Sequence, residues 1–147
     1  MEDILYGKTL VALGDSLFYG NKLGNEATWI NKLGKKHNMT VYNYGINGNT
    51  VAMQEDEPKT PPMCVRYADM ADGADYVVVL GGANDKRLHV PIGKDDDTDP
   101  HTFKGALNVL ILGITDRLRS ISLAIGEFHT AKPYFTAILA KARIIYI

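Results

Sequence analysis

Three short apolar runs in this 147-residue chain each end at a glycine-rich corner, and this repeated pattern constrains the fold more than any other feature. The runs cover Lys8–Leu13, Thr40–Tyr44 and Asp75–Leu80. Short runs rich in β-branched residues that stop at glycine are typical of buried strands. Apolar residues at helical spacing follow the first run over Asn25–His37 and the third from Thr102 to about Leu118. Strands alternating with helices predict an α/β fold, a three-layer αβα sandwich with a parallel sheet covered on both faces.

The rest of the chain predicts two further strands, over Ile121–Ile125 and Arg143–Ile147, with a helix from Pro133 to about Ala142 between them. In parallel α/β sheets, ligands bind at the carboxyl ends of the strands. The glycine-rich corners occupy residues 14–20, 45–50 and 81–85. Because each corner follows a predicted strand, we expect all three to converge on one rim of the sheet.

Composition and charge exclude several classes of protein. The chain has the length of a single domain, residues 1–147. Its 16 basic and 17 acidic residues give a formal net charge of −1, so nothing in the electrostatics favours nucleic acid as a partner. Cys64 is the only cysteine, which fits a reducing compartment. Acidic residues at positions 2 and 3 do not resemble a secretory signal, and no apolar run is long enough for a membrane span. We therefore expect a cytoplasmic protein.

The first corner carries Asp15 and Ser16, and these two residues indicate its chemistry. Phosphate binding is disfavoured because no G-x-x-x-x-G-K-[ST] or G-x-G-x-x-G follows the run, and Asp15 would oppose a phosphate. A serine on a tight turn at a strand end is exposed at the rim and can act as a nucleophile. The other corners add donors, a glycine N–H and the side-chain amide of Asn84. One nucleophile with donors for an oxyanion makes an acyl-transfer site.

The corner motifs also resemble a known family. The motifs are "GDSL" at 14–17, "NGNT" at 47–50 and "GAND" at 82–85. In order, spacing and position they are similar to the first three sequence blocks of the SGNH, or GDSL, hydrolase family of esterases and lipases. The resemblance covers residues 8 to about 115, whereas residues 117–147 are atypical. It implies the flavodoxin-like SGNH hydrolase fold.

Family roles transfer to matching positions of this chain. The resemblance implies that Ser16 is the nucleophile. It implies an oxyanion hole formed by the backbone N–H of Ser16, the backbone N–H of Gly48 and the side chain of Asn84. Asp15 corresponds to the acid beside the serine, and we expect it to organise the turn by hydrogen bonds rather than to titrate in the mechanism.

One family feature is missing. Members of the family place a D-x-x-H motif near the C-terminus, where the histidine is the general base, and this sequence contains no D-x-x-H. Among its histidines, His37 ends a predicted helix and His101 lies at a helix entrance. His89, five residues after Asn84, and His129, after the predicted fourth strand, are candidate substitute bases if they come within about 3 Å of the serine oxygen.

The C-terminal part differs from the preceding chain, since residues 128–147 include no acidic residue. We expect a member whose C-terminal part is truncated or altered by a frame disruption. Loss of a terminal helix would leave apolar sheet surface uncovered, so we also expect a homo-oligomer.

These observations favour a carboxylic ester hydrolase with a serine nucleophile and an oxyanion hole, impaired by the missing His and Asp. No long apolar lid segment is present, which favours short acyl esters. The alternative is a catalytically inactive relative that binds an ester or carbohydrate ligand. No cofactor is expected. No metal is expected either, because the acidic run at 95–99 lacks the glycine of a calcium loop and is best explained as a solvated loop.

Overall fold

The fold is that of a computed structural model, which describes residues 3–55, 60–117, 123–127 and 136–140. Its strands are β1 (Thr9–Gly14), β2 (Thr40–Gly45), β3 (Tyr76–Gly81), β4 (Leu123–Glu127) and β5 (Thr136–Ala140). Its α-helices are α1 (Ser16–Tyr19), α2 (Trp29–Lys36), α3 (Met63–Arg66), α4 (Ala83–Arg87) and α5 (Phe103–Arg117). Three short 3-10 helices are η1 (Asn21–Leu23), η2 (Asn25–Ala27) and η3 (Tyr67–Asp69).

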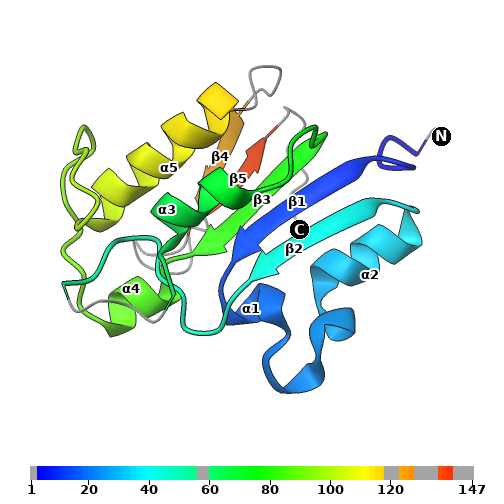
Figure 1. The fold of residues 1–147 in the computed structure, drawn as a ribbon, viewed down its shortest axis with the longest axis horizontal. Helices are drawn as coiled ribbons and strands as arrows, with labels where there is room; N and C mark the ends of the chain where they lie inside the picture. Colours follow the sequence, from blue (N-terminus) through cyan, green and yellow to red (C-terminus); the bar gives the residue numbers. More distant parts are fainter. Residues whose placement is uncertain (1–2, 56–59, 118–122, 128–135, 141–147) are drawn as a thin grey trace.

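The strands form one sheet in the order β2-β1-β3-β5-β4. The predicted parallel sheet is confirmed for β2, β1 and β3, where Gly14 pairs with Gly45 on one side and with Leu80 on the other. The carboxyl ends of these three strands therefore lie side by side at one edge of the sheet, with α1 and α4 next to it (Figure 1). This is the rim at which the three glycine-rich corners were expected.

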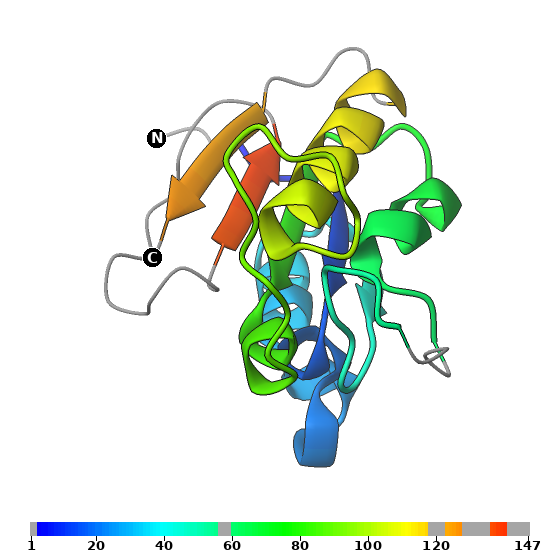
Figure 2. The same ribbon diagram turned by 90° about the vertical axis from the view of Figure 1, so that its left-hand side faces the viewer.

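Alternation along the strands builds two separate cores, one on each face of the sheet. Val11, Leu13, Val77 and Val79 pack with α3 and α5, together with the loop after β2. Leu10, Ala12 and Val78 point the other way and pack with Phe18 of α1 and Ile30 of α2. Because neighbouring strand residues face opposite sides, helices are needed on both, and they are found there (Figure 2). The predicted three-layer arrangement is confirmed.

The helix α5 begins where the sequence predicted. Thr102 precedes its first residue, and the Thr102 Oγ1 accepts a hydrogen bond from the N–H of Gly105 at 3.1 Å. The same hydroxyl donates to Asp97 Oδ2 at 2.8 Å, so the cap also fastens the preceding loop. Hydrogen bonds from the backbone N–H of Asp99 and from Thr102 hold the pKa of Asp97 below its ordinary value. In the described part of the chain, no helix is long and apolar enough to cross a bilayer.

The C-terminal elements differ from the expectation. A strand was predicted near Ile121–Ile125, and β4 occupies Leu123–Glu127. The helix predicted from Pro133 to about Ala142 is wrong, because Thr136–Ala140 forms β5, which runs antiparallel to both β3 and β4. A short unbroken apolar run does not distinguish a buried strand from a helix, which explains the error. The terminal strand predicted over Arg143–Ile147 lies outside the described residues.

Replacing the cap of α5 tests this account of the helix start. Thr102→Ala removes an acceptor for a first-turn N–H and should lower the free energy of unfolding by about 1 kcal/mol. Thr115→Ala is the matched control, because the Thr115 hydroxyl donates only to Ile111 O within the same helix. It should change stability by less than about 0.5 kcal/mol. Urea unfolding followed by circular dichroism measures both, and equal effects of the two variants would contradict the assignment of the cap.

Candidate active site

The corner after β1 is a tight helical turn that presents Ser16. Asp15 is the N-cap of α1, and its Oδ1 accepts a hydrogen bond from the N–H of Leu17 at 3.0 Å. Ser16 is the first residue of α1 and is half-buried. The N–H of a first helical residue such as Ser16 has no acceptor within its own helix. The turn closes at Gly20, whose N–H donates to Ser16 O.

Asp15 is 2% exposed, and burial raises the pKa of its carboxyl group, with the hydrogen bond from Leu17 partly offsetting the effect. The Asp15 side chain therefore faces the turn and not the solvent. Its hydrogen bond with the N–H of Leu17 therefore shapes the turn that carries Ser16.

Phe18, which is fully buried, anchors α1 to the sheet and packs edge-on against Trp29 at 5.6 Å between ring centroids.

The corner after β2 lies directly against α1. A Cβ on Gly45 would come within 2.3 Å of the backbone nitrogen of Tyr19, so only glycine permits this approach. The N–H of Ile46 donates to Gly14 O at 3.0 Å, and the Asn43 side chain donates to Phe18 O at 2.8 Å. Gly48 follows at the exposed part of the loop with φ of +73°, a conformation that favours glycine.

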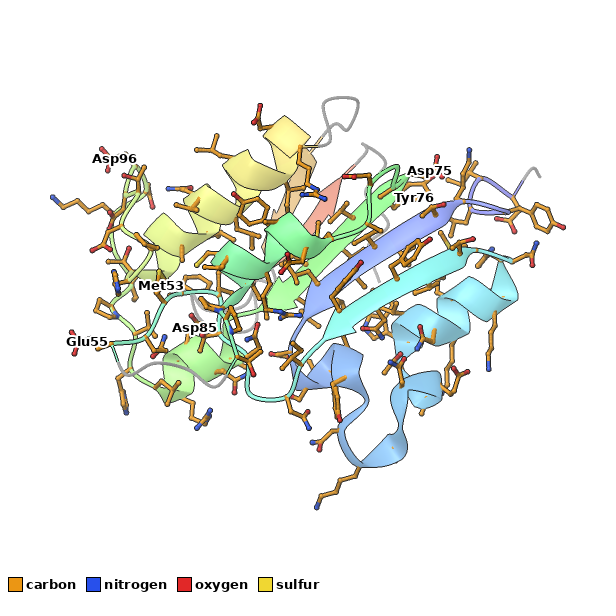
Figure 3. All side chains as sticks on the ribbon, in the orientation of Figure 1. Met53, Glu55, Asp75, Tyr76, Asp85 and Asp96 are labelled. Carbon is orange, nitrogen blue, oxygen red and sulfur yellow. The ribbon has the colours of Figure 1, made fainter. Side chains whose placement is uncertain are left out.

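The corner after β3 is joined to the same loop. The Nδ2 of Asn84 donates to Asn49 O at 3.0 Å, which leaves the second proton of that amide for another acceptor. Asp85 is fully buried, and its carboxylate accepts from the N–H of Val51 and the N–H of Ala52 at 2.9 Å each. Figure 3 shows Asp85 beside the segment that carries Met53, at the opposite end of the sheet from Asp75 and Tyr76.

The structure thus connects the three predicted corners through hydrogen bonds between them. The loop after β2 is bonded to Gly14, two residues before Ser16, on one side and to Asn84 on the other. Gly48 lies on this loop between the two attachment points. Ser16, Gly48 and Asn84 therefore lie on corners that hydrogen bonds connect, while their roles as nucleophile and oxyanion donors stay predictions.

Asp85 is the residue that sequence reasoning missed. It follows Asn84 in the "GAND" corner, and its position inside a glycine-rich turn after a buried strand was the available signal. Burial raises the pKa of Asp85, while the hydrogen bonds from Ala52 and Val51 act in the opposite direction. A carboxylate that satisfies two main-chain donors of a neighbouring loop fixes that loop to α4.

Two of the described histidines, His37 and His101, are paired with carboxylates. His37 is the C-cap of α2, three residues before β2, and contacts Asp3, with 2.8 Å between Nδ1 and Oδ2. His101 contacts Asp99 across 3.0 Å at the entrance of α5. His89 is exposed, with φ of +58°, just after α4. His129 lies outside the described residues, so its place relative to Ser16 stays a prediction.

The acidic run at 95–99 has partners of its own. Asp95 contacts the ammonium of Lys104, Asp97 accepts from Thr102, and Asp99 accepts from the N–H of His101. In the part of the chain that the structure describes, no group of three or more His, Cys, Asp or Glu side chains is placed to share a metal ion.

Three parallel strands with helices on both faces and three glycine-rich corners at one rim match the fold of the SGNH hydrolase class. A profile of the GDSL-like Lipase/Acylhydrolase family matches residues 12–143. The chain belongs to this family. The matched range extends past residue 117, into the segment that is atypical by sequence. Among curated proteins, none matches the chain significantly.

Solved structures also resemble the chain. One crystal structure is 36% identical with a TM-score of 0.71, over 78% of this chain and 54% of its own. A protein from Lactobacillus plantarum is 31% identical with a TM-score of 0.68, over 78% and 53%. A protein from Desulfitobacterium hafniense DCB-2, assigned to the lipolytic proteins of the G-D-S-L family, is 20% identical with a TM-score of 0.58, over 76% and 56%. The last supports the fold alone. The chain spans about half the length of these three proteins.

Titration of Asp85 provides a test of its buried position. Because burial raises the pKa above its ordinary value of 3.8, the folded state binds this proton more tightly than the unfolded state. The stability from this group is fully present below that value and is lost as the pH rises through the folded-state pKa. The stability advantage of the natural protein over Asp85→Asn should therefore be largest near pH 4. As the pH rises through the folded-state pKa, this stability advantage should fall by about 1.4 kcal/mol for each unit by which the pKa of Asp85 is raised.

Urea unfolding of both proteins between pH 3.5 and 7.5 measures this difference. The pKa of Asp15 is also raised, but both proteins contain Asp15, so its effect cancels in the comparison. An advantage that instead widens with pH would show that Asp85 is ionised more easily when folded, against the account given above.

Proposed function

We propose that the chain is an SGNH-type carboxylic ester hydrolase that acts on short acyl esters through an acyl-serine intermediate. Ser16 Oγ attacks the ester carbonyl carbon and loses its proton to a base. The carbonyl oxygen becomes an oxyanion, the carbon–oxygen bond to the alcohol breaks, and the alcohol leaves with a proton. Water then loses a proton to the base and attacks the acyl carbon, the bond from this carbon to Ser16 Oγ breaks, Oγ takes up the proton, and the carboxylic acid leaves.

The proposal is carried by one observation, the double attachment of the loop after β2. Its bond to Gly14, two residues before Ser16, and its bond from Asn84 support a hole made by the N–H of Ser16, the N–H of Gly48 and the side chain of Asn84. Donors fixed before the reaction stabilise a developing oxyanion, and each contributes about 3 kcal/mol to transition-state binding. The apolar side chain of Leu17, 53% exposed next to the nucleophile, supports an acyl group as neighbour.

The source of the base limits the expected rate. His37 and His101 are paired with carboxylates, and among the described residues no histidine is hydrogen-bonded to Ser16. His89 and His129 stay candidate substitute bases. Loss of the histidine of a serine hydrolase lowers turnover by about 10⁶-fold. We therefore infer a slow enzyme. The cytoplasmic location and the homo-oligomer stay predictions from the sequence, as does the altered C-terminal part.

The second candidate is a protein that binds an ester or carbohydrate at this rim without turning it over. The pairing of His37 and His101 away from Ser16 favours it. The two proposals differ in one observable, since only the first requires release of the alcohol from an ester and transient acylation of Ser16.

Removing the nucleophile and one donor tests the proposed chemistry. With 4-nitrophenyl acetate as substrate, Ser16→Ala should abolish acylation of the chain and lower kcat to the rate that substrate binding and the oxyanion donors sustain without a nucleophile. Asn84→Ala should lower kcat by about 10²- to 10³-fold, because it removes one oxyanion donor. Asn108→Ala is the matched control, because the Asn108 amide also donates to main-chain oxygens, those of Asp95 and Asp97, but lies on α5. It should leave kcat within about twofold of the natural value.

Initial rates for purified protein and mass spectrometry of the acylated chain measure these effects. Hydrolysis that persists in Ser16→Ala would exclude Ser16 as the nucleophile. Ligand binding without any acylation of Ser16 would favour the second candidate, a protein that binds an ester or carbohydrate without turning it over.

A further inference from the structure

Arg66 is a buried cation at the end of α3 and has no described carboxylate within ion-pair distance. Its exposed fraction is 8%, and burial lowers the pKa of its guanidinium, with Asp69 acting weakly in the opposite direction. Burying a charge without a counter-ion is costly unless hydrogen bonds replace the lost water. Those hydrogen bonds therefore indicate what the residue does in this fold.

The guanidinium of Arg66 bridges the end of β2 and the first part of the loop that follows it. Its Nη1 donates to Asn49 Oδ1 at 2.6 Å, and its Nη2 donates to Tyr44 O. Tyr44 is the penultimate residue of β2, and Asn49 directly follows Gly48. A planar guanidinium holds its donors in a fixed geometry, so it sets the separation of the two acceptors. Gly48 lies inside the short segment that this cation closes.

Asn49 extends the effect of Arg66 to the third corner. The Asn49 side chain is 4% exposed, and its Nδ2 donates to Pro61 O at 2.9 Å. Its main-chain oxygen is the acceptor for Asn84 Nδ2 at 3.0 Å. A shift of Asn49 would therefore move the partner of Asn84 as well as the residue that follows Gly48.

We propose that Arg66 is a positioning residue that holds the Gly48 N–H and the Asn84 side-chain amide in place by bridging Tyr44 O and Asn49 Oδ1. The inference rests on the proposed function for its catalytic consequence, but the bridging itself can be tested without activity. A misplacement of about 1 Å in a reacting group can cost about 10²-fold in rate, which sets the expected effect.

Arg66→Lys tests the proposal, because lysine keeps the charge but cannot bridge two acceptors with a planar fork. Arg117→Lys is the matched control. Arg117 also donates to two main-chain oxygens, those of Ala68 and Met70, but it holds the segment around η3. In ¹⁵N relaxation measurements, the order parameter of the Gly48 amide should be near about 0.85 in the natural protein and in Arg117→Lys. It should fall below about 0.6 in Arg66→Lys.

A second pair of variants covers the case in which Arg66→Lys does not fold. Asn49→Asp keeps an oxygen acceptor for Arg66 but loses the donor to Pro61, and Asn49→Ala loses both. The Gly48 amide should stay ordered in Asn49→Asp and become mobile in Asn49→Ala. A Gly48 amide that is mobile in both variants would assign its ordering to the bond with Pro61. A Gly48 amide that is ordered in both would show that the Asn49 acceptor is not needed. Either result would overturn the role of Arg66.

Kinetics then test the catalytic consequence. Arg66→Lys should lower kcat about 10²-fold with KM within about threefold, whereas Arg117→Lys should change neither. If the natural protein shows no hydrolysis that depends on Ser16, the proposed function fails while the relaxation data still decide whether Arg66 orders Gly48. An unchanged Gly48 amide in Arg66→Lys, or equal losses of kcat in Arg66→Lys and Arg117→Lys, would overturn the proposal.

Discussion

The carboxylate of Asp85 joins two corners of the sheet that are 34 residues apart in the chain, and the geometry of the rim depends on this contact. The described residues of the loop after β2, 46–55 and 60–62, form no helix or strand that would satisfy their backbone donors. Asp85 accepts two of them, from Val51 and Ala52, from a fully buried position. Without such an acceptor, the buried N–H groups would cost about 1–3 kcal/mol each. The loop that carries Gly48 is therefore held against α4.

The loop has buried charged groups of opposite sign on its two sides. Arg66 bonds the residues around Gly48, and Asp85 bonds the two residues beyond Thr50. Arg66 and Asp85 do not form an ion pair with each other in the described structure. Each is compensated mainly by groups of the loop or of the strand before it. This arrangement makes the position of the loop depend on tertiary contacts, because its residues 46–55 form no helix or strand.

The sequence was sufficient to predict the parts of the fold that local patterns determine. The three parallel strands, their shared rim and the start of α5 near Thr102 all follow from periodicity and glycine position. The placement of Ser16, with Asp15 shaping its turn, was predictable for the same reason. The contacts of Arg66 and Asp85 were not, because their partners are distant in the chain and no local pattern identifies them. The segment now seen as β5 was misassigned, since its strand pairing with β3 depends on the sheet and not on its own periodicity.

The central claim is that three corners of one sheet surround a single serine hydroxyl with donors for a negatively charged oxygen. A crystal structure of the protein after reaction with a 4-nitrophenyl alkylphosphonate would test it most directly, because the tetrahedral phosphorus resembles the acyl-transfer intermediate. The account predicts a bond from phosphorus to Ser16 Oγ, with one phosphonyl oxygen about 3 Å from the nitrogens of Ser16, Gly48 and the Asn84 side chain. An adduct on another residue, the absence of any adduct, or a phosphonyl oxygen directed away from Gly48 and Asn84 would contradict it.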